Sequence, residues 1–455
     1  MNPRRLSGVA RAVQGAMSGD DVEVSDVITD SRVARSGSLF FALPGERTDG
    51  ARFVDEAFAR GAAAVVVGHG VEVGGPAVHV RSPGGALLRL AADERATGMY
   101  GVRVIAITGA NGKTSTKDFT AAVLGARFRT HASPGSYNNE IGLPVTMLTA
   151  PDGVEVIVAE MGARHIGDVR LLCEIARPDI VVVTNVGVAH IEVFGSWDAI
   201  VEASAEPLEA LDAGGIAVLS ADDSIVAGLP RPAGVRVITF GRSPGADVRA
   251  EAVELDDRGR ASFDLVDTDA GEPVELAVPG EHMVSNALAA AACGLVLGLT
   301  AAECASGLKG VRISPWRMET FTTADGVHVV NDAYNANPES MAAALRSARW
   351  MAREGRLIAV LGPMAELGPI ASEEHERVGE LAARIRVDRL ITVGGDARAM
   401  ASAALREGVE PENVVSFEDP GDALADVRAN ARAGDVVLFK ASRVVGLERL
   451  AEALR

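Results

Sequence analysis

The stretch with the clearest chemical signature is a β-branched run that ends in a glycine loop, Gly109–Gly112, and continues into Lys113-Thr114-Ser115. The glycines let a polyphosphate approach the backbone, and the loop amides and the next helix N-terminus direct partial positive charge toward it. Lys113 can reach the outer phosphates as a point charge, and the hydroxyl of Thr114 or Ser115 can bind Mg²⁺. Only two residues separate the glycines, where a P-loop has four, so an ordinary strand-to-helix turn is the alternative. We expect a phosphate-binding loop.

Lysine usage adds to this expectation. Among the 44 basic residues only four are lysine, namely Lys113, Lys117, Lys309 and Lys440. In a chain so biased toward arginine, a retained lysine indicates a place where a planar guanidinium does not fit, although four residues can also persist by chance.

Composition excludes several classes of protein. The 455 residues, 48% hydrophobic and 23% charged, are typical of a globular protein of two to four domains. The net charge of −18 argues against a nucleic-acid-binding surface. Cys173, Cys293 and Cys304 lack metal-ligand spacing and indicate reduced thiols of a cytoplasmic protein. The first residues lack the apolar run of a signal peptide, and the apolar stretch Ala287–Leu299 is too short to span a bilayer, so we expect no membrane insertion.

Alternating strand and helix patterns predict an α/β protein of three domains. Residues 1–98 form a small N-terminal α/β domain, with strands at Val22–Ile28, Leu39–Leu43 and Ala62–Val67 and helices at Phe53–Gly61 and Leu87–Thr97. A polar loop at 44–50 is either a solvated turn or a ligand loop.

We expect residues 99–312 to form the central domain, with a mostly parallel sheet and helices on both faces. Together with the glycine loop, this sheet would make a P-loop-type ATPase domain. Its predicted strands are Val102–Ile107, Val154–Ala159, Ile180–Val183, Ile216–Leu219 and Val235–Phe240. Ligands bind at the carboxyl ends of such strands, where this sequence has Glu160, Thr184-Asn185 and His190. Residues 250–278 interrupt the alternation with antiparallel strands.

Residues 313–455 form a Rossmann-like C-terminal domain. It begins with a hairpin, Met318–Thr323 and Val327–Val330, around an Ala-Asp-Gly turn. The elements that follow are strands Leu357–Leu361, Arg389–Val393 and Asp435–Lys440 and helices Glu339–Met351, Glu373–Ile385 and Asp422–Ala431. They predict a second doubly wound sheet.

Several polar residues beside these strands suit a magnesium–nucleotide site, and each has a plainer alternative. Glu160 offers a hard oxygen ligand but also suits a helix N-cap or a solvated strand end. His190 offers an imidazole but also suits a hydrogen-bonded core position. Arg317 and Asp332 flank the hairpin and can reach a nucleotide only from another domain. Polar turns at 138–144 and 334–338 can face a substrate or cap a helix.

Together these residues resemble the Mur ligases of bacterial cell-wall synthesis. The matching pieces span all three domains in order: Thr29–Arg32, Leu39–Gly50, Thr108–Ser115, Asn138–Pro144, Glu160–Ala163, Thr184–His190, His282–Asn286, Arg317–Glu319, Asn331–Ser340, Leu361–Gly368 and Lys440–Arg443. The string Asp332–Pro338 is most specific to the member that adds D-alanyl-D-alanine to UDP-N-acetylmuramoyl-tripeptide. The resemblance implies an ADP-forming peptide ligase that uses ATP and Mg²⁺. Its partners would be the UDP-linked muramoyl peptide and D-alanyl-D-alanine, and it would act as a monomer in peptidoglycan precursor synthesis.

The resemblance also implies roles for individual residues. Lys113, Glu160, His190 and Arg317 would carry catalysis, with Thr114, Glu160 and His190 binding magnesium. The further ATP-binding residues would be Gly109, Asn111, Gly112, Ser115, Asn286, Asp332 and Asn335. The substrate-binding residues would be Ser31 and Arg32, in a UDP-substrate-binding domain at 1–98, with Asn138 and Asn139.

The chain departs from the family's usual pattern at four positions. Ser204 stands where the family usually has a lysine, whose carbamate helps to hold a second magnesium. Trp316 replaces a glycine, Pro363 an acidic residue and Ala51 a histidine. These changes keep two alternatives open. One is a related amide ligase that acts on another carboxylate and amine in specialised metabolism, and the other is a nucleotide-binding regulatory subunit without turnover.

Overall fold

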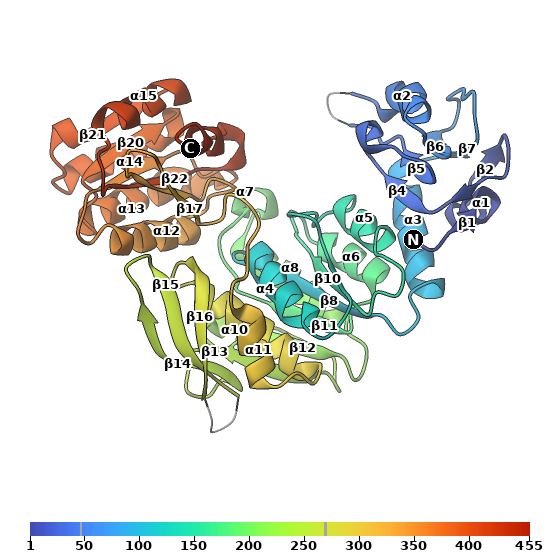
Figure 1. The fold of residues 1–455 in the computed structure, drawn as a ribbon, viewed down its shortest axis with the longest axis horizontal. Coiled ribbons are helices and arrows are strands. Elements are labelled where there is room, and N and C mark those ends of the chain that lie inside the picture. Colours follow the sequence, from blue (N-terminus) through green and yellow to red (C-terminus); the bar gives the residue numbers. More distant parts are fainter. Residues whose placement is uncertain (46–47, 268–270) are drawn as a thin grey trace.

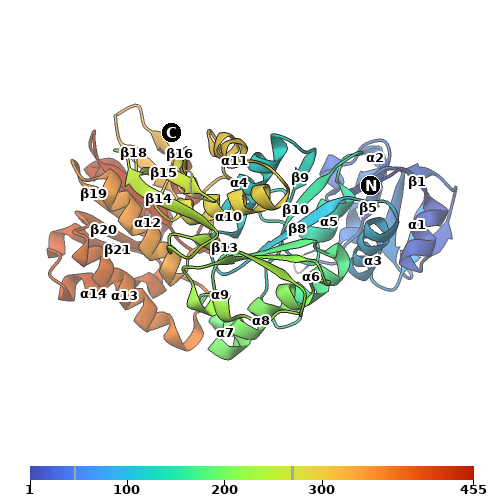
Figure 2. The same cartoon turned by 90° about the horizontal axis from the view of Figure 1, so that it is seen from below.

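The computed structural model describes residues 1–45, 48–267 and 271–455, and within these ranges the strands form four sheets. Three of them organise an N-terminal, a central and a C-terminal unit. The central unit lies between the other two in both views of the ribbon (Figures 1 and 2). The sheets fall within the three expected domains, whose boundaries stay a prediction. The middle of the polar loop at 44–50 lies outside the described residues.

The N-terminal unit is a five-stranded sheet, described in the order β2-β7-β6-β5-β4, with helices on both faces. Its elements are β1 (Arg4–Arg5), α1 (Leu6–Val13), β2 (Ala16–Ser18), β3 (Glu23–Val24), β4 (Asp26–Ile28), β5 (Ser38–Phe41), α2 (Val54–Ala59), β6 (Ala64–Gly68), β7 (Ala77–Val80) and α3 (Pro83–Thr97). Alternate residues of β5 explain the layering, because Phe41 packs with α3 and Phe40 with α2. The single strand predicted at Val22–Ile28 is wrong. The chain forms two short strands there, β3 and β4, which are separated at Ser25, whose amide donates to Gly37 O.

The central unit has a nine-stranded sheet among the described residues, in the order β16-β15-β14-β13-β12-β11-β8-β10-β9. Its elements are β8 (Arg103–Thr108), α4 (Lys113–Gly125), β9 (Thr130–Ala132), α5 (Gly142–Leu148), β10 (Val156–Glu160), α6 (Asp168–Ala176), β11 (Ile180–Val183), α7 (Ile191–Phe194), α8 (Trp197–Glu209), β12 (Ile216–Ser220), α9 (Ser224–Gly228), β13 (Arg236–Gly241), β14 (Val248–Leu255), β15 (Arg260–Val266), β16 (Gly271–Pro279), α10 (Met283–Val296) and α11 (Ala301–Leu308).

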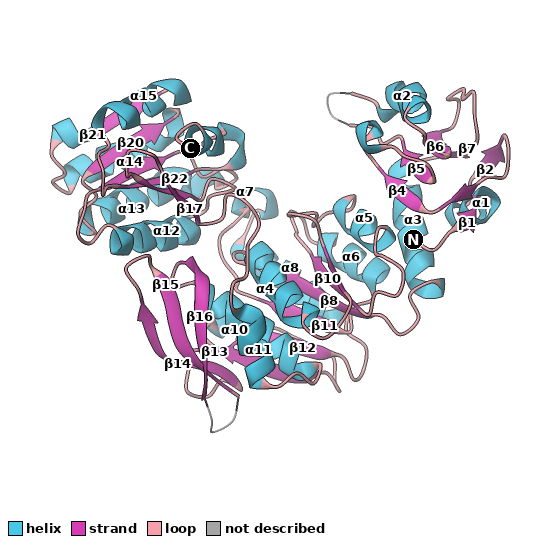
Figure 3. Cartoon of the chain, viewed as in Figure 1, coloured by secondary structure: helices cyan, strands magenta, loops and turns pink. Residues whose placement is uncertain are grey.

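The predicted character of this sheet is confirmed. From β9 to β14 in the order of the sheet, and including β8, neighbouring strands pair in parallel. Strand β15 pairs antiparallel with both β14 and β16. Along β8 the side chains alternate between two cores. Ile105 and Ile107 pack with α4 and α10, and Val104 and Ala106 with α5 and α6. Figure 3 shows the helices on both sides of the strands. This layering places the carboxyl ends of β8, β10 and β11 at one edge.

The C-terminal unit has a six-stranded sheet, described in the order β17-β18-β22-β19-β20-β21, with only β17 antiparallel. Its elements are β17 (Glu319–Thr322), β18 (His328–Asn331), α12 (Pro338–Met351), β19 (Leu357–Leu361), α13 (Ala371–Arg384), β20 (Arg389–Val393), α14 (Arg398–Arg406), β21 (Val414–Phe417), α15 (Pro420–Asn430), β22 (Val436–Lys440) and α16 (Glu448–Glu452). The sequence analysis did not identify α14 or β21. The latter is a short, half-exposed edge strand without strong alternation.

Two further sequence predictions bear on the whole chain. Cys173, Cys293 and Cys304 are buried free thiols, and burial raises the pKa of each to about 12. No helix in the described ranges is both long and apolar enough to cross a membrane.

Candidate active site

The glycine loop after β8 has the backbone geometry of a tight cradle. Gly109 and Gly112 adopt φ values of +131° and +81°, and α4 begins immediately afterwards at Lys113. A Cβ atom at 109 would lie 2.2 Å from Thr184 Oγ1, and one at 112 would lie 2.4 Å from Asn286 Oδ1. Both the conformation and the space therefore require glycine.

Residues after β11 hold this loop in place. The Asn111 amide donates to Asn185 Oδ1 at 2.8 Å, and Thr184 Oγ1 donates to Asn111 O at 2.7 Å. The Ala110 amide also donates to Asn185 O at 3.0 Å. The loop is thus preorganised by the neighbouring strand end, as expected where parallel strands end together.

Lys113 carries the cation of the loop. Its Nζ donates to Gly109 O at 2.7 Å and to Ala110 O at 3.2 Å, which curls the side chain back over the cradle. Burial lowers the pKa of Lys113, while Glu160 raises it and Arg317 lowers it. Glu160 and Arg317 are therefore close enough to Lys113 to act on its charge, although Arg317 belongs to the C-terminal unit.

Unpaired polar atoms mark the space in front of the loop. Among the described residues, five buried side-chain nitrogen or oxygen atoms have no hydrogen-bond partner. Three of them belong to the predicted site, namely Thr114 Oγ1, Glu160 Oε2 and Arg317 Nε. Leaving such atoms unpaired in a protein interior is costly, so three of them on residues of one predicted site point to a polar ligand.

Glu160 lies at the end of β10 and is 1% exposed. Its Oε1 accepts from Asn138 Nδ2 at 2.8 Å, and its own amide donates to Ser133 Oγ at 3.1 Å. Glu160 is therefore neither a helix N-cap nor a solvated strand end, the two plainer roles that the sequence allowed. A buried carboxylate with one oxygen unpaired offers the kind of ligand that a hard divalent cation prefers, and so does the unpaired Thr114 hydroxyl.

His190 follows β11 and precedes α7, with a left-handed φ of +63°. Its Nδ1–H donates to Glu366 Oε2 of the C-terminal unit. Burial lowers the pKa of His190, and the contact with Glu366 raises it. The net direction is downward, which favours the neutral imidazole that metal ligation requires.

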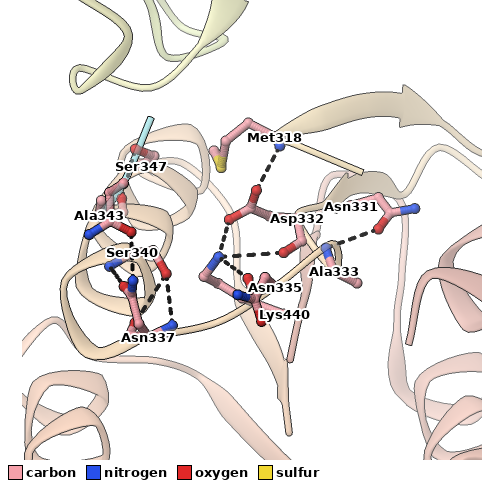
Figure 4. A network of polar contacts seen from close by, with 11 residues as sticks. Met318, Asn331, Asp332, Ala333, Asn335, Asn337, Ser340, Ala343, Ser347 and Lys440 are labelled. Carbon is pink, nitrogen blue, oxygen red and sulfur yellow. Dashed lines mark hydrogen bonds and ion pairs between the residues drawn. The ribbon is translucent and has the colours of Figure 1, made fainter. Parts of the chain in front are cut away.

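The C-terminal unit contributes a polar network around Asp332 and Lys440 (Figure 4). Asp332 Oδ1 accepts the Met318 amide at 3.0 Å, and Asp332 Oδ2 pairs with Lys440 Nζ at 2.5 Å. Lys440 also donates to Asn335 O at 3.1 Å. The Asp332 carboxylate therefore fixes the segment that presents Arg317.

Arg317 itself stacks on an aromatic ring. Its Cζ lies 4.2 Å from the centre of the Tyr334 ring. The flanking Trp316 and Met318 have left-handed φ values of +62° and +52°. At 316 this conformation explains why the family usually has glycine. Trp316 is held there by Arg443, whose Cζ lies 4.2 Å from the Trp316 ring.

The remaining predicted residues of the central and C-terminal units lie in different surroundings. Asn286 is 7% exposed under the loop, where its Oδ1 accepts from Thr116, and Ser115 is buried in the first turn of α4. Asn335 is exposed beside the network. Asn139 accepts the Gly142 amide and so helps to begin α5.

Ser31 and Arg32 lie in the N-terminal unit, in a 3₁₀ turn just after β4. The Ser31 hydroxyl donates to Glu56 Oε2 at 2.8 Å, while Arg32 pairs with Asp30 on the surface. They are therefore near each other but belong to a different unit from the phosphate loop.

Three residues that support the site were not among the predicted site residues. Lys117 is 2% exposed and donates to Ser133 O at 2.8 Å and Gly135 O at 2.6 Å, while Lys440 and Glu366 act as described above. The scarcity of lysine was a usable signal, because Lys113, Lys117 and Lys440 each bind loop carbonyls beside this site.

The Ser204 side chain is too short to take the place of a carbamylated lysine at a metal site. Its hydroxyl donates to Ile200 O at 2.7 Å, within α8. Glu206, two residues on, is fully buried and accepts the backbone amides of Gly167 and Arg170 at the start of α6. Neither side chain has the geometry to replace that carbamate.

Comparison with known proteins agrees with this arrangement. The sequence matches the Mur ligase family catalytic domain over residues 23–86, the Mur ligase middle domain over 107–294 and the Mur ligase glutamate ligase domain over 316–443. It is 41% identical to the UDP-N-acetylmuramoyl-tripeptide–D-alanyl-D-alanine ligase of Mycobacterium tuberculosis (strain ATCC 25618 / H37Rv), over 93% of this chain and 91% of that protein. The chain belongs to the Mur ligase family.

Solved structures of other Mur ligases resemble this one over its whole length. MurF from Acinetobacter baumannii superposes with a TM-score of 0.87 at 30% identity, covering 99% of this chain and 98% of that one. MurF from Thermotoga maritima, solved in complex with ADP, gives a TM-score of 0.81 at 29% identity, covering 95% and 97%. The three-unit α/β architecture is therefore that of a Mur ligase.

Proposed function

We propose that this Mur ligase joins D-alanyl-D-alanine to the terminal carboxylate of UDP-N-acetylmuramoyl-tripeptide, converting ATP to ADP and phosphate, in peptidoglycan precursor synthesis. The observation that carries the proposal is the group of unpaired polar atoms of Thr114, Glu160 and Arg317 around the glycine loop. Identity and coverage relative to proteins of that name support the choice of substrates.

The proposed chemistry has two steps. A carboxylate oxygen of the peptide attacks the γ-phosphorus of ATP, and ADP leaves as the acyl phosphate forms. The amine nitrogen of D-alanyl-D-alanine then attacks the acyl carbon and loses a proton, and phosphate leaves as the amide forms. Charge develops on phosphate oxygens in both steps, so positioning and electrostatic stabilisation dominate catalysis.

The residues of this chain supply that stabilisation from two units. The loop amides and Lys113 hold the phosphates from the central unit, and Arg317 faces them from the C-terminal unit. Enclosure between the units keeps water away from the reactive acyl phosphate. Asp332 and Asn335 would bind the ribose and the adenine end of the nucleotide, and Asn286 supports the loop from beneath.

The donor set fits magnesium. Thr114 Oγ1 and Glu160 Oε2 are buried and unpaired, and His190 is favoured in its neutral form. We propose that these three side chains hold the ion. When bound, Mg²⁺ would neutralise charge on the phosphate oxygens.

The N-terminal unit would hold the uridine nucleotide through Ser31 and Arg32, and Asn138 and Asn139 would face the peptide. The protein would act in the cytoplasm as a monomer, which sedimentation analysis can check.

An ADP-release assay with product identification by mass spectrometry tests the function. We expect ADP and the UDP-linked pentapeptide only when ATP, Mg²⁺, UDP-N-acetylmuramoyl-tripeptide and D-alanyl-D-alanine are all present. Tripeptides that end in lysine and in diaminopimelate should be compared, with L-alanyl-L-alanine as the matched control amine. No ADP release with either tripeptide would overturn the proposal, and turnover of other carboxylates and amines would favour the alternative amide ligase.

A further inference from the structure

A loop of the C-terminal unit, between β19 and α13, reaches across to the central unit. The Glu192 amide donates to Glu366 O at 3.1 Å. A Cβ atom at Gly368 would lie 3.0 Å from the Glu192 Cβ, so the two backbones pack closely. Glu366 holds a left-handed φ of +60°, which a glutamate adopts only where its surroundings enforce it. The loop is therefore seated on the start of α7.

The Glu366 carboxylate contacts two loops of the central unit at once. Its Oε2 accepts the Nδ1–H of His190, and its Oε1 lies 3.2 Å from Arg164 Nη2. His190 follows β11, and Arg164 follows β10, the strand that ends at Glu160. One side chain of the C-terminal unit thus contacts His190 itself and the segment that follows Glu160.

This contact decides which imidazole nitrogen is available. A carboxylate can only accept, so Nδ1 of His190 is the protonated nitrogen and Nε2 keeps its lone pair. No described residue forms a hydrogen bond with Nε2. A carboxylate that accepts from the far nitrogen is the usual means by which a protein orients a metal-binding histidine and raises its basicity.

We propose that Glu366 is a positioning residue for His190, and that it makes the metal affinity of the central unit depend on docking of the C-terminal unit. The inference rests on the proposed role of His190 in the function above. Its consequence is a thermodynamic coupling. Docking of the loop at 366–368 strengthens metal binding, and bound metal strengthens docking by the same factor.

The simpler explanation of the same contacts is a latch, in which Glu366 only holds the two units together. The chain offers matched variants to separate the two roles. Glu366→Ala removes both arms of the contact, and Glu366→Asp withdraws the carboxylate by one methylene. Arg164→Ala removes only the ion pair and leaves the His190 contact intact.

Metal binding can be measured on the full-length protein with Mn²⁺ and a non-hydrolysable ATP analogue, using the paramagnetic resonance signal of free Mn²⁺. We expect Glu366→Ala to weaken Mn²⁺ binding in the presence of nucleotide by about tenfold or more. Glu366→Asp should weaken it less, and Arg164→Ala should stay within about twofold of wild type. Nucleotide affinity without Mn²⁺ should not change.

The double variant decides between positioning and latching. If Glu366 acts through His190, then Glu366→Ala adds no further loss of Mn²⁺ affinity in a His190→Asn background. Unchanged Mn²⁺ affinity in Glu366→Ala, or a full additional loss in the double variant, would overturn the inference. Thermal melts check folding, and if Glu366→Ala does not fold, Glu366→Asp with and without His190→Asn provides the same comparison.

This experiment contains no peptide or amine substrate. Failure of the ADP-release assay would therefore count against the proposed function alone. Failure of the Mn²⁺ cycle would count against the role of Glu366 alone.

Discussion

The central unit meets its two neighbours through junctions of different construction. On the N-terminal side α3 packs along α5 and α6, and Leu87 and Leu90 share an apolar cluster with Leu143 and Leu172. Arg95 completes this side by donating to the backbone carbonyls of Ala176, Val102 and Arg177 at 2.8 to 3.0 Å.

On the C-terminal side an apolar cluster is also continuous, but polar contacts reach the catalytic loops themselves. Asn337 Nδ2 donates to Asn111 Oδ1 at 2.7 Å, and Glu366 contacts His190. The first junction holds the N-terminal unit in place against the central unit. The second junction brings residues of the C-terminal unit into the candidate active site. Substitutions at the first should therefore change stability, and substitutions at the second should change chemistry.

The largest effect is expected from Lys113→Ala, at the second junction. Its ammonium acts on phosphate and not in a core, so turnover should fall by at least about a thousandfold while the fold survives. Lys113→Arg should not restore turnover, because a planar guanidinium does not reproduce the compact ammonium that donates to Gly109 O and Ala110 O. ADP release and circular-dichroism melts measure the two properties. Near-normal turnover would remove the glycine loop from the site.

Asp332→Ala should combine both kinds of effect. It leaves Lys440, whose side chain is 3% exposed, without its carboxylate, and it frees the Met318 amide next to Arg317. We expect the C-terminal unit to lose about 3 kcal/mol in free energy of unfolding. The turnover of the folded fraction should fall as well. Denaturant titration and ADP release separate these losses, and a stable, fully active variant would show that the network is dispensable.

Arg95→Ala tests the first junction. Removing the guanidinium leaves carbonyls at the ends of α6 and of the linker without donors, so we expect a loss of about 2 kcal/mol in the free energy of unfolding. The affinity for an ATP analogue should be unchanged, since no contact of Arg95 reaches the loop. Calorimetric binding and thermal melts check this. A selective loss of nucleotide affinity would break the distinction between the junctions.

Ser204→Lys should have the smallest effect. It lies within the central unit, away from the contacts described for both junctions, and tests the metal site alone. Serine lacks the reach and the charge of a carbamate, so the wild type should need more Mg²⁺ and be insensitive to bicarbonate. The lysine variant should need less Mg²⁺ and respond to bicarbonate. Rates across a Mg²⁺ series, with and without bicarbonate, measure both. If the two curves coincide and already saturate at low Mg²⁺, another group completes the metal site.

The sequence predicted well what local patterns determine. Gly109 and Gly112 could be placed because strand, loop and helix are contiguous, and Glu160 because it follows a buried strand. Ser31, by contrast, gave no sign that its hydroxyl binds Glu56, since that contact depends on the packing of α2 beside the turn. Contacts between units were beyond prediction for the same reason.

Glu366 shows this most clearly. It is 176 residues from His190, and nothing in the Leu361–Gly368 stretch that resembles the family indicates which residue it contacts. The pairing of Asp332 with Lys440 spans 108 residues and was equally invisible. The scarcity of lysine drew attention to Lys440 but gave no indication of its partner.

Helix α12 contacts the central unit near both of its ends, and this has a mechanical consequence. Its first residues lie beside the Asn111 loop. The other end of α12 lies next to the hairpin of β14 and β15 (Figure 1). There Trp350 Nε1 donates to Asp256 O at 2.9 Å, and Arg353 pairs with Asp257. A helix of 14 residues is about 21 Å long. With the turn as a fulcrum, a tilt of about 10° would swing the far end by about 4 Å over that length. A displacement of that size would take Asn337 Nδ2 out of hydrogen-bond range of Asn111 Oδ1, which now lies 2.7 Å away. A small rotation of α12 would therefore be enough to separate it from the phosphate loop.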